Sequence, residues 1–206
     1  MKNDYFQVVR GGLNSTFQDL GRKNLYHIGL PFSGAMDKRN YLIANKLIDN
    51  NKNDPVLEFA FQGPSLKYFG TKRNIVVTGD VNFKIIKNNN SQNKGECYKT
   101  IELDEGDTID ILSTNKSVYG YFSISGGFNL DKVWGSFSTT IRAHIGSNNG
   151  NKLIDGQDIK LNKPNQLLNK KLDFINSKIE FIRVIKGTNF DYFSEQSIKD
   201  FFSKDF

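Results

Sequence analysis

Cysteine and histidine are nearly absent from this sequence. Cys97 is the only cysteine among 206 residues, so the chain cannot form an internal disulfide or a four-cysteine zinc site. An acid and no histidine flank this cysteine, so its neighbours in the sequence do not favour the thiolate that a nucleophile needs. The two histidines, His27 and His144, are far apart in the sequence, and we expect no bound metal.

Long runs of basic or apolar residues are also missing. The 28 basic residues give a net charge of +6, but they scatter along the chain and form no basic run. A nucleic-acid surface needs a clustered basic stripe with stacking aromatics, so we expect no nucleic-acid partner. No apolar stretch approaches the roughly 20 residues that cross a bilayer, and residues 1–5 lack the apolar core of a signal peptide. We therefore expect a cytoplasmic protein.

Aromatic and β-branched residues are abundant instead. The chain is 37% hydrophobic and holds 17 Phe and 8 Tyr, which is enough for a substantial core. Short apolar runs between turn residues predict strands over 5–10, 56–61, 74–78, 83–86, 98–103, 108–112 and 118–124. This spacing favours a barrel or a sandwich over alternating strands and helices, so we predict a mainly β fold.

One helix is predicted over residues 37–49. Asp37 suits the N-cap position, and the residues after it place apolar side chains at helical spacing. A polar triplet and then Pro55 end the pattern. The turn at residues 33–36 is therefore expected at a helix N-terminus, where free amide hydrogens and the helix dipole favour an anion.

The sequence divides near residue 165. Residues 1–165 are predicted to form the first domain, and the polar residues 166–177 are predicted to form a linker. Residues 178–185 then predict a strand, and Ser194 predicts the N-cap of a helix. A lone strand and helix bury too little surface to be stable alone. Residues 178–206 therefore either dock on the first domain or open a second, incomplete domain.

The first candidate site segment is Gln18-Asp19-Leu20-Gly21-Arg22, which is rich in polar groups. Arg22 suits a planar anion such as a carboxylate, carboxybiotin or a phosphate, because its guanidinium donates two parallel hydrogen bonds. A simple β-turn is the alternative. In that turn Asp19 caps the backbone, Gly21 takes a positive φ and Arg22 pairs with Asp19.

The second candidate segment, Ser33-Gly34-Ala35-Met36-Asp37, leads into the predicted helix. Its three small residues would let the backbone approach a ligand, and the helix would supply oriented amides. A capped helix start with no ligand explains the same residues equally well. Ser33 lacks the flanking glycines of a nucleophile elbow. His27, earlier in the loop, either transfers a proton or is a hydrogen-bonded structural residue.

Glu58 is an acid inside an apolar strand. Strand alternation could point it to solvent. If Glu58 is buried it needs a partner, with Arg22 or Arg39 as candidates, and it would then be a site carboxylate.

Glycines and hydroxyls also gather in Ser125-Gly126-Gly127 and in residues 135–140. Neither segment has phosphate-loop spacing followed by lysine, so a Walker-type site is not supported. Tight β-turns explain the glycines alone. The hydroxyls of Ser136, Ser138 and Thr139 suit recognition of a carboxylate or an amide.

Together these segments resemble the carboxyltransferase-domain family. That family includes the C-type subunits of 5-oxoprolinase, allophanate hydrolase subunit 2, the KipA-type proteins and the carboxyltransferase part of urea amidolyase. Many fixed spacings occur in order, which makes the match specific where any one alone would be weak. The matching positions are Thr16 with 18–22, His27 with Gly29, Pro31 with 33–37, Ala44-Asn45, Leu57-Glu58, Gly63-Pro64, 125–127, Gly135-Ser136 with Ser138-Thr139, and Gly156 with Asp158.

The resemblance implies cyclophilin-like β-barrel domains, with a reaction site formed between them and with a partner protein. It implies an ATP-dependent hydrolase that opens 5-oxoproline to glutamate together with A-type and B-type partner proteins of the same system, the ATP being used by the complex. Alternatives within the family are a component of a biotin-dependent carboxyltransferase or allophanate hydrolase, with biotin on a partner chain, and a KipA-type regulatory binding module. Members of the family continue well past the positions that residues 182–206 match, so the resemblance implies a truncated chain that is inactive alone.

The residues and the resemblance together give the expected site. We expect Arg22, Asp37 and Glu58 to be catalytic, with Arg22 and the amides of residues 33–37 as donors to a developing anion. The expected substrate-binding residues are Thr16, Gln18, Asp19, His27, Ser33, Gly34, Ala35, Met36, Gly126, Gly127, Ser136, Ser138 and Thr139.

Overall fold

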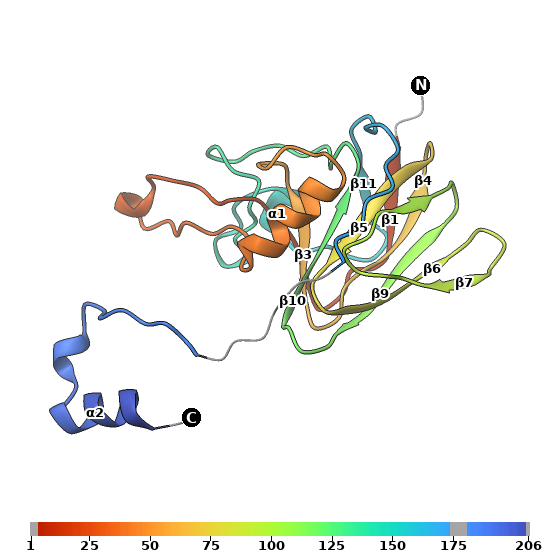
Figure 1. Ribbon diagram of the computed structural model, residues 1–206. Helices are drawn as coiled ribbons and strands as arrows, with labels where there is room; N and C mark the ends of the chain where they lie inside the picture. The colour runs from red at the N-terminus through yellow and green to blue at the C-terminus, as the bar shows by residue number, and fades with distance from the viewer. Residues whose placement is uncertain (1–3, 174–180, 205–206) are drawn as a thin grey trace. The chain divides into compact units, whose positions relative to one another are not determined.

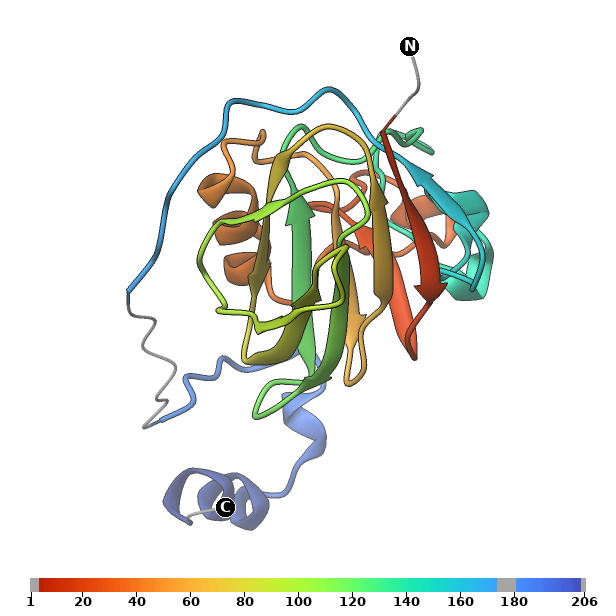
Figure 2. The same ribbon diagram turned by 90° about the vertical axis from the view of Figure 1, so that its right-hand side faces the viewer.

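The strands pair into two antiparallel sheets and do not close into one barrel (Figures 1 and 2). The computed structural model describes residues 4–173 and 181–204. One sheet has the strand order β11 (Asp158–Lys160), β1 (Tyr5–Arg10), β4 (Ser65–Phe69), β9 (Thr108–Thr114), β6 (Val81–Ile86) and β7 (Gln92–Lys94). The other has the order β2 (Asn14–Gln18), β3 (Val56–Ala60), β10 (Tyr119–Ile124), β5 (Arg73–Thr78) and β8 (Ile101–Leu103). The prediction of a mainly β fold is confirmed.

The main core lies between the two sheets. Strand alternation turns one set of side chains inward from each sheet, as in a sandwich. Phe6 on β1 meets Phe122 on β10 edge to face, with ring centroids 5.6 Å apart. Phe17 on β2 meets Phe128 in the same way at 5.0 Å. The first pair spans the two sheets, and the second extends the core beneath the β10–β11 connection, each through a large buried surface.

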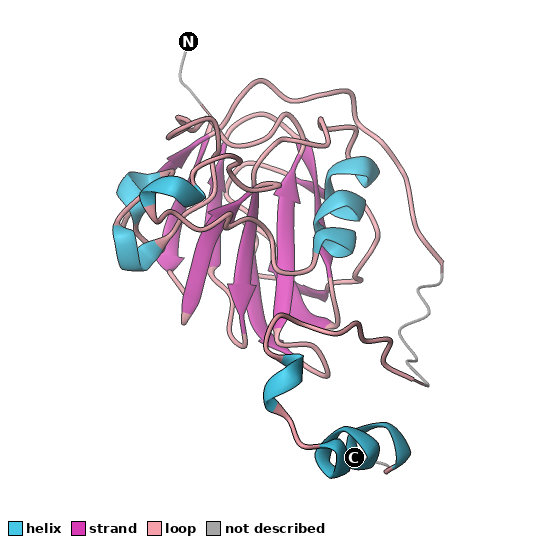
Figure 3. Cartoon of the chain, turned by 90° about the vertical axis from the view of Figure 1, so that its left-hand side faces the viewer, coloured by secondary structure: helices cyan, strands magenta, loops and turns pink. Residues whose placement is uncertain are grey.

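Helix α1 (Lys38–Leu47) covers the outer face of the five-stranded sheet (Figure 3). It begins after Asp37, whose carboxylate accepts a hydrogen bond from Asn40 N at 3.0 Å. The predicted helix and its N-cap are therefore confirmed. The apolar stripe of α1 packs on Val56, Val76 and Tyr121, which project from β3, β5 and β10.

Two long connections lie near this face. One joins β2 to α1 and contains the 3₁₀ turn η1 (Tyr26–Ile28); the other joins β10 to β11 and contains η2 (Ile141–Ala143) and η3 (Asn148–Gly150). Strand β2 itself was not predicted, because Phe17 is its only large apolar residue. Its other side chains are polar and yet mostly buried, since the two connections cover them.

The C-terminal residues form a separate unit, Phe174–Phe206. It contains η4 (Phe190–Tyr192) and α2 (Glu195–Ser203), whose N-cap Ser194 accepts a hydrogen bond from Ser197 N at 3.2 Å, as predicted. Residues 181–185 form no strand, because no neighbouring strand pairs with them there. Residues 174–180, which include parts of the predicted linker and strand, lie outside the described residues. The second-domain interpretation stays a prediction. In the described ranges no helix is long and apolar enough to cross a membrane.

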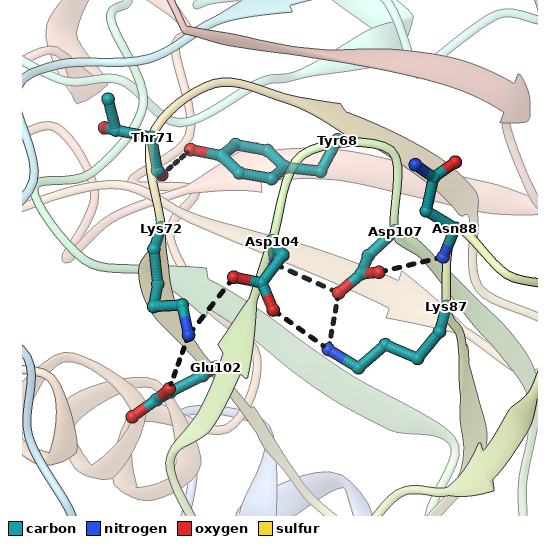
Figure 4. A network of polar contacts seen from close by, with 8 residues as sticks. All are labelled: Tyr68, Thr71, Lys72, Lys87, Asn88, Glu102, Asp104 and Asp107. Carbon is teal, nitrogen blue, oxygen red and sulfur yellow. Dashed lines mark hydrogen bonds and ion pairs between the residues drawn. The ribbon is translucent and has the colours of Figure 1, made fainter.

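A polar network ties the two sheets together at one end (Figure 4). Asp107, which is 1% exposed, accepts hydrogen bonds from Lys87 Nζ, Asn88 N and Asp104 N at 2.7, 3.1 and 3.0 Å. Lys87 and Asn88 directly follow β6 of one sheet, while Asp104 follows β8 of the other. The Asp107 carboxylate therefore links a turn of each sheet.

We expect Asp107→Ala to lower the free energy of unfolding by about 2–4 kcal/mol, because two partly buried backbone amides and the Lys87 ammonium lose their common acceptor. Glu102→Gln is the matched control, since the Lys72–Glu102 pair in the same network is exposed and should contribute less than about 1 kcal/mol. Denaturant unfolding of both variants measures the difference. Equal losses would contradict the special role of Asp107.

Candidate anion-binding site

Three segments that are distant in the sequence lie side by side next to β2. Arg22 N donates to Phe32 O at 2.8 Å, and Ala35 N donates to Asp19 O at 2.9 Å. Thr139 N donates to Phe17 O at 2.9 Å. The segment after β2, the segment before α1 and the segment around residue 138 are thus joined through their backbones. The structure brings together the two candidate segments and the hydroxyl cluster that the sequence suggested.

The Asp19 carboxylate holds this arrangement. Its Oδ1 accepts hydrogen bonds from Gly21 N, Ser136 Oγ and Ser138 Oγ at 2.8, 2.6 and 2.5 Å. Its Oδ2 accepts from Phe137 N at 2.7 Å. The side chain is buried, so these bonds replace water almost completely. Asp19 therefore joins its own turn to the segment after residue 135.

Arg22 lies buried beneath two hydroxyl groups. The residue is only 2% exposed. Its Nη1 donates to Thr140 Oγ1 at 3.0 Å and to Ser33 Oγ at 3.3 Å. Nη2 donates to the carbonyl of Ser138. The alternative turn is confirmed in two features, since Asp19 accepts from Gly21 N and Gly21 has a positive φ. Its third feature is wrong, because among the described residues Arg22 forms no ion pair and bonds to Ser33, Thr140 and Ser138 instead of Asp19. Burial lowers the pKa of Arg22, and the charge of Asp19 opposes that shift from a distance.

The cluster of Arg22, Ser33 and Thr140 has one hydroxyl hydrogen without an acceptor in the described part of the chain. Ser33 Oγ and Thr140 Oγ1 are 2.7 Å apart, so one hydroxyl donates to the other. Both oxygens accept from Arg22, which leaves one hydroxyl hydrogen free to donate. Arg22 Nε is also buried without an acceptor in the described structure. The cluster can therefore still take a hydrogen-bond acceptor, and its positive charge favours an anion.

Two glycines allow the close approach of the segments. A Cβ atom on Gly34 would lie 2.9 Å from Gly21 N, and one on Gly21 would lie 2.6 Å from Phe32 O. Both residues also have positive φ, at +94° and +86°. Any larger residue at either position would separate Arg22 from Ser33.

Glu58 is buried, 8% exposed, beside the start of α1. Its Oε2 accepts hydrogen bonds from Met36 N at 2.7 Å and from Tyr121 Oη at 2.8 Å. The register places Glu58 directly between Thr16 on β2 and Tyr121 on β10. The structure thus gives Glu58 an amide and a phenol as partners, while Arg22, one of the arginines expected beside it, bonds elsewhere. Burial raises the pKa of Glu58, and these two hydrogen bonds only partly offset the rise.

The amides before α1 already have acceptors. Ala35 N donates to Asp19 O, Met36 N donates to Glu58, and Asp37 N donates to Tyr121 Oη at 2.6 Å. The Asp37 carboxylate is used by Asn40, whose N and Nδ2 both donate to it. The expectation that these three amides bind a ligand is therefore corrected: the protein satisfies them internally. A catalytic role for Asp37 stays a prediction.

The other expected residues fall into two groups. Gln18 lies within the cluster, where its Nε2 donates to Thr16 Oγ1 at 2.9 Å and to Thr139 O at 3.0 Å, and its buried Oε1 has no donor in the described structure. His27 instead lies exposed in η1, which projects away from the sheets (Figure 1). Gly126 and Gly127 are held by Asn50 and Asn162 beyond the end of β10, apart from the cluster.

Sequence reasoning did not select Thr140, although its hydroxyl is central to the cluster. Tyr121 was also missed, because it looks like an ordinary strand aromatic. The signal for Thr140 was present, since it continues the run of hydroxyl residues after Gly135. The signal for Tyr121 appears only when strand register places its ring beside Glu58.

We expect Asp19→Asn to lower the free energy of unfolding by about 1–3 kcal/mol, because one amide hydrogen-bond donor must then face a protein donor. Asp131→Asn, at an exposed position on the β10–β11 connection, should change it by less than about 0.5 kcal/mol. Chemical denaturation followed by circular dichroism compares the two. A neutral Asp19→Asn variant would show that the four bonds at Asp19 contribute little.

Replacing Glu58 by Gln tests the raised pKa. Below the ordinary value of 4.5 the carboxyl is neutral in both the folded and the unfolded states. As the pH rises above that value, the unfolded chain ionises first, so the wild type loses stability until the pH passes the folded pKa. We therefore expect wild type to become progressively less stable relative to Glu58→Gln as the pH rises above about 4.5. A pH-independent difference in unfolding free energy would contradict the shift.

Comparison with known proteins places this chain in a family. The family model for the carboxyltransferase domain, subdomain A and B, matches residues 28–206. Urea amidolyase of Lachancea kluyveri is 31% identical over 165 residues, 77% of this chain and 8% of that protein. The C-type subunit of 5-oxoprolinase from Haemophilus influenzae is 31% identical over 146 residues, 71% of this chain and 46% of that protein. The crystal structure of the K. lactis urea amidolyase matches with a TM-score of 0.73 and 31% identity, over 84% of this chain and 10% of that one.

The chain spans less than half the length of each of these relatives. The family match nevertheless covers most of the chain, including Ser33, Glu58 and Thr140 of the site. The resemblance stated from the sequence is confirmed, and this chain belongs to the carboxyltransferase domain family.

Proposed function

We propose that this chain supplies the substrate-anion site of a protein like the C-type subunit of 5-oxoprolinase. Such a protein works in a multi-subunit complex that uses ATP to hydrolyse 5-oxoproline to glutamate. The observation that carries the proposal is the buried guanidinium of Arg22, which has no ion pair in the described structure and lies beneath the half-buried hydroxyls of Ser33 and Thr140. A substrate carboxylate would accept the free hydroxyl hydrogen and balance the buried charge.

The site suits a small carboxylate better than a polyphosphate. A phosphate group takes several backbone amides at a helix start or a glycine-rich loop. At α1 the amides of residues 35–37 are already bonded to Asp19, Glu58 and Tyr121. These residues do not fit a nucleotide, so the proposal assigns ATP to partner chains and takes no step through it here.

In this proposal Glu58 and Asp37 position the binding residues and do not contact the substrate. Glu58 holds Met36 N and Asp37 caps α1, so together they fix the segment that carries Ser33 over Arg22. This role needs no proton transfer to substrate. It assigns binding to Arg22, Ser33 and Thr140, and it assigns the support of that geometry to Glu58, Asp37 and Asp19.

The remaining parts of the reaction belong to partners. The relatives from Haemophilus influenzae and Escherichia coli are named as one lettered component of 5-oxoprolinase, which indicates an assembly of several different chains. We propose A-type and B-type partner proteins of the same system for this chain. We also propose that residues 178–206 open a second domain. The separate C-terminal unit supports this, because none of its described residues is buried.

A second candidate function is biotin-dependent carboxyl transfer to a urea-type substrate. It is favoured by the urea amidolyase relatives, one of which aligns over 96% of this chain at 27% identity. Carboxybiotin also presents a planar carboxylate, so the same cluster would accept it. For this function biotin is carried by a partner chain.

Thr140 offers a matched pair of variants for testing the site. In a complex reconstituted with the A-type and B-type partners, we expect Thr140→Val to lower kcat/KM for 5-oxoproline by roughly 10–100-fold, because one hydroxyl donor is lost. Thr140→Ser keeps the hydroxyl and should lie much closer to wild type. Arg22→Gln should lose at least as much as Thr140→Val. The measurement is ATP-dependent release of glutamate.

The same assay separates the candidate functions. Transfer of labelled carboxyl from carboxybiotin to urea, without glutamate release, would favour the second candidate. A complex that binds 5-oxoproline but turns over neither substrate would favour the regulatory binding module. Glutamate release that Arg22→Gln and Thr140→Val leave unchanged would overturn the site assignment.

A further inference from the structure

We propose that Trp134 anchors a docking surface for an acidic partner protein. The inference rests on the proposed function, because the partner would be another component of the same complex. It starts from the hairpin turn at residues 133–136, where Val133 and Ser136 exchange two backbone hydrogen bonds, of 2.9 and 3.3 Å. Trp134 stands at the tip of that turn and is 56% exposed.

The backbone at Trp134 is strained. Its φ is +51° and that of Gly135 is +78°, so both central residues occupy the left-handed region. Two-residue hairpins of this kind strongly prefer Asn-Gly, since a bulky side chain at positive φ is unfavourable. A large aromatic at this position costs stability, and more than half of its surface, 56%, stays exposed instead of packing within the chain. Such strain tends to be retained where the residue serves binding.

The turn is held rigidly from beneath. Ser136 Oγ, Phe137 N and Ser138 Oγ all donate to the buried Asp19 carboxylate. The exposed ring therefore projects from a fixed base, and its ordering costs little on binding. Tryptophan is among the side chains most enriched at the positions that dominate the binding energy of protein interfaces.

Apolar and basic side chains accompany Trp134. Ile141 and Arg142 are exposed on the same connection, and Lys132 lies just before the turn. The connection from β2 to α1 contacts Thr140 of this connection through Arg22 and Ser33. We call the exposed side chains of the β10–β11 connection near the turn the Trp134 surface; it comprises Lys132, Trp134, Ile141 and Arg142.

The positive charges of the Trp134 surface favour an acidic partner. Lys132 and Arg142 are exposed cations, against one exposed acid beside them, Asp131, and the chain as a whole carries a net charge of +6. A second copy would place these like charges opposite one another, which disfavours self-association. A partner with an apolar pocket for the indole and an acidic rim would match both features. The Arg22 cluster would then lie next to the interface, since Thr140 directly precedes Ile141.

The single tryptophan gives a direct test. The whole chain is labelled with 5-fluorotryptophan and titrated with the A-type and B-type proteins of the same source. We expect the one ¹⁹F signal to shift on complex formation. Trp134→Asn should weaken the complex by roughly tenfold or more, while its thermal midpoint stays equal or rises because Asn relieves the strained backbone. A structural role for Trp134 would instead lower the midpoint.

Charge variants complete the test. Lys132→Glu combined with Arg142→Glu should weaken the complex, and added salt should weaken the wild-type complex. The control is Lys94→Glu on β7, an exposed edge strand of the other sheet, which should bind as wild type does. A complex that forms without moving the ¹⁹F signal, or a signal that moves with the chain's own concentration, would overturn the proposal.

The outcome is separable from that of the proposed function. If the chain binds neither partner protein but binds 5-oxoproline in an Arg22-dependent way, the docking proposal fails and the anion site stands. If the complex forms through Trp134 while Arg22→Gln leaves glutamate release unchanged, the docking proposal stands and the anion site fails.

Discussion

The site depends on one buried carboxylate. Asp19 accepts four hydrogen bonds from neutral donors, three of them in the segment of residues 136–138. No cation is needed to satisfy it. Because its oxygens are filled in this way, Asp19 fixes the turn that positions Arg22 without forming an ion pair with it. The guanidinium is thus held in place by a nearby anion and still keeps donor capacity for another. A direct Asp19–Arg22 pair would have given the same turn and no site.

The hydrogen bonds already made by the backbone amides also determine whether the start of α1 can bind an anion. A helix N-terminus normally offers amides to an anion, but here Asp19, Glu58 and Tyr121 occupy those of residues 35–37. The helix start therefore serves as an anchor, and ligand binding falls to side-chain hydroxyls. Burying Glu58 to hold one amide is unfavourable for its charge, as its raised pKa shows. That cost is tolerated because the anchored segment carries Ser33 to Arg22.

Most of the strands and both helices could be predicted from the sequence, and the elements that could not be predicted were missed for physical reasons. Apolar runs revealed β1, β3, β5, β6, β8, β9 and β10, and capping chemistry revealed α1 and α2. Such runs could not reveal β2, because polar side chains such as Thr16 and Gln18 are buried there by loops that the sequence does not place. Composition marked three segments that the structure brings together beside β2. Partner choice stayed open, since the acceptor of Met36 N depends on strand register, and register is a tertiary property.

The positions with strained backbone or unpaired charge also distinguish residues that hold the fold from residues that bind a ligand or partner. Gly21 and Gly34 take positive φ where glycine tolerates it, so the inner part of the site is built at low cost. Trp134 takes positive φ where asparagine or glycine would be favoured, and it does so on an exposed tip. An internal packing role would not account for that choice, because the indole is not buried. The inner residues satisfy the chain's own geometry. Among the described residues, the Arg22 cluster instead holds a charge without a counter-ion, and the Trp134 turn holds a ring that is more than half exposed.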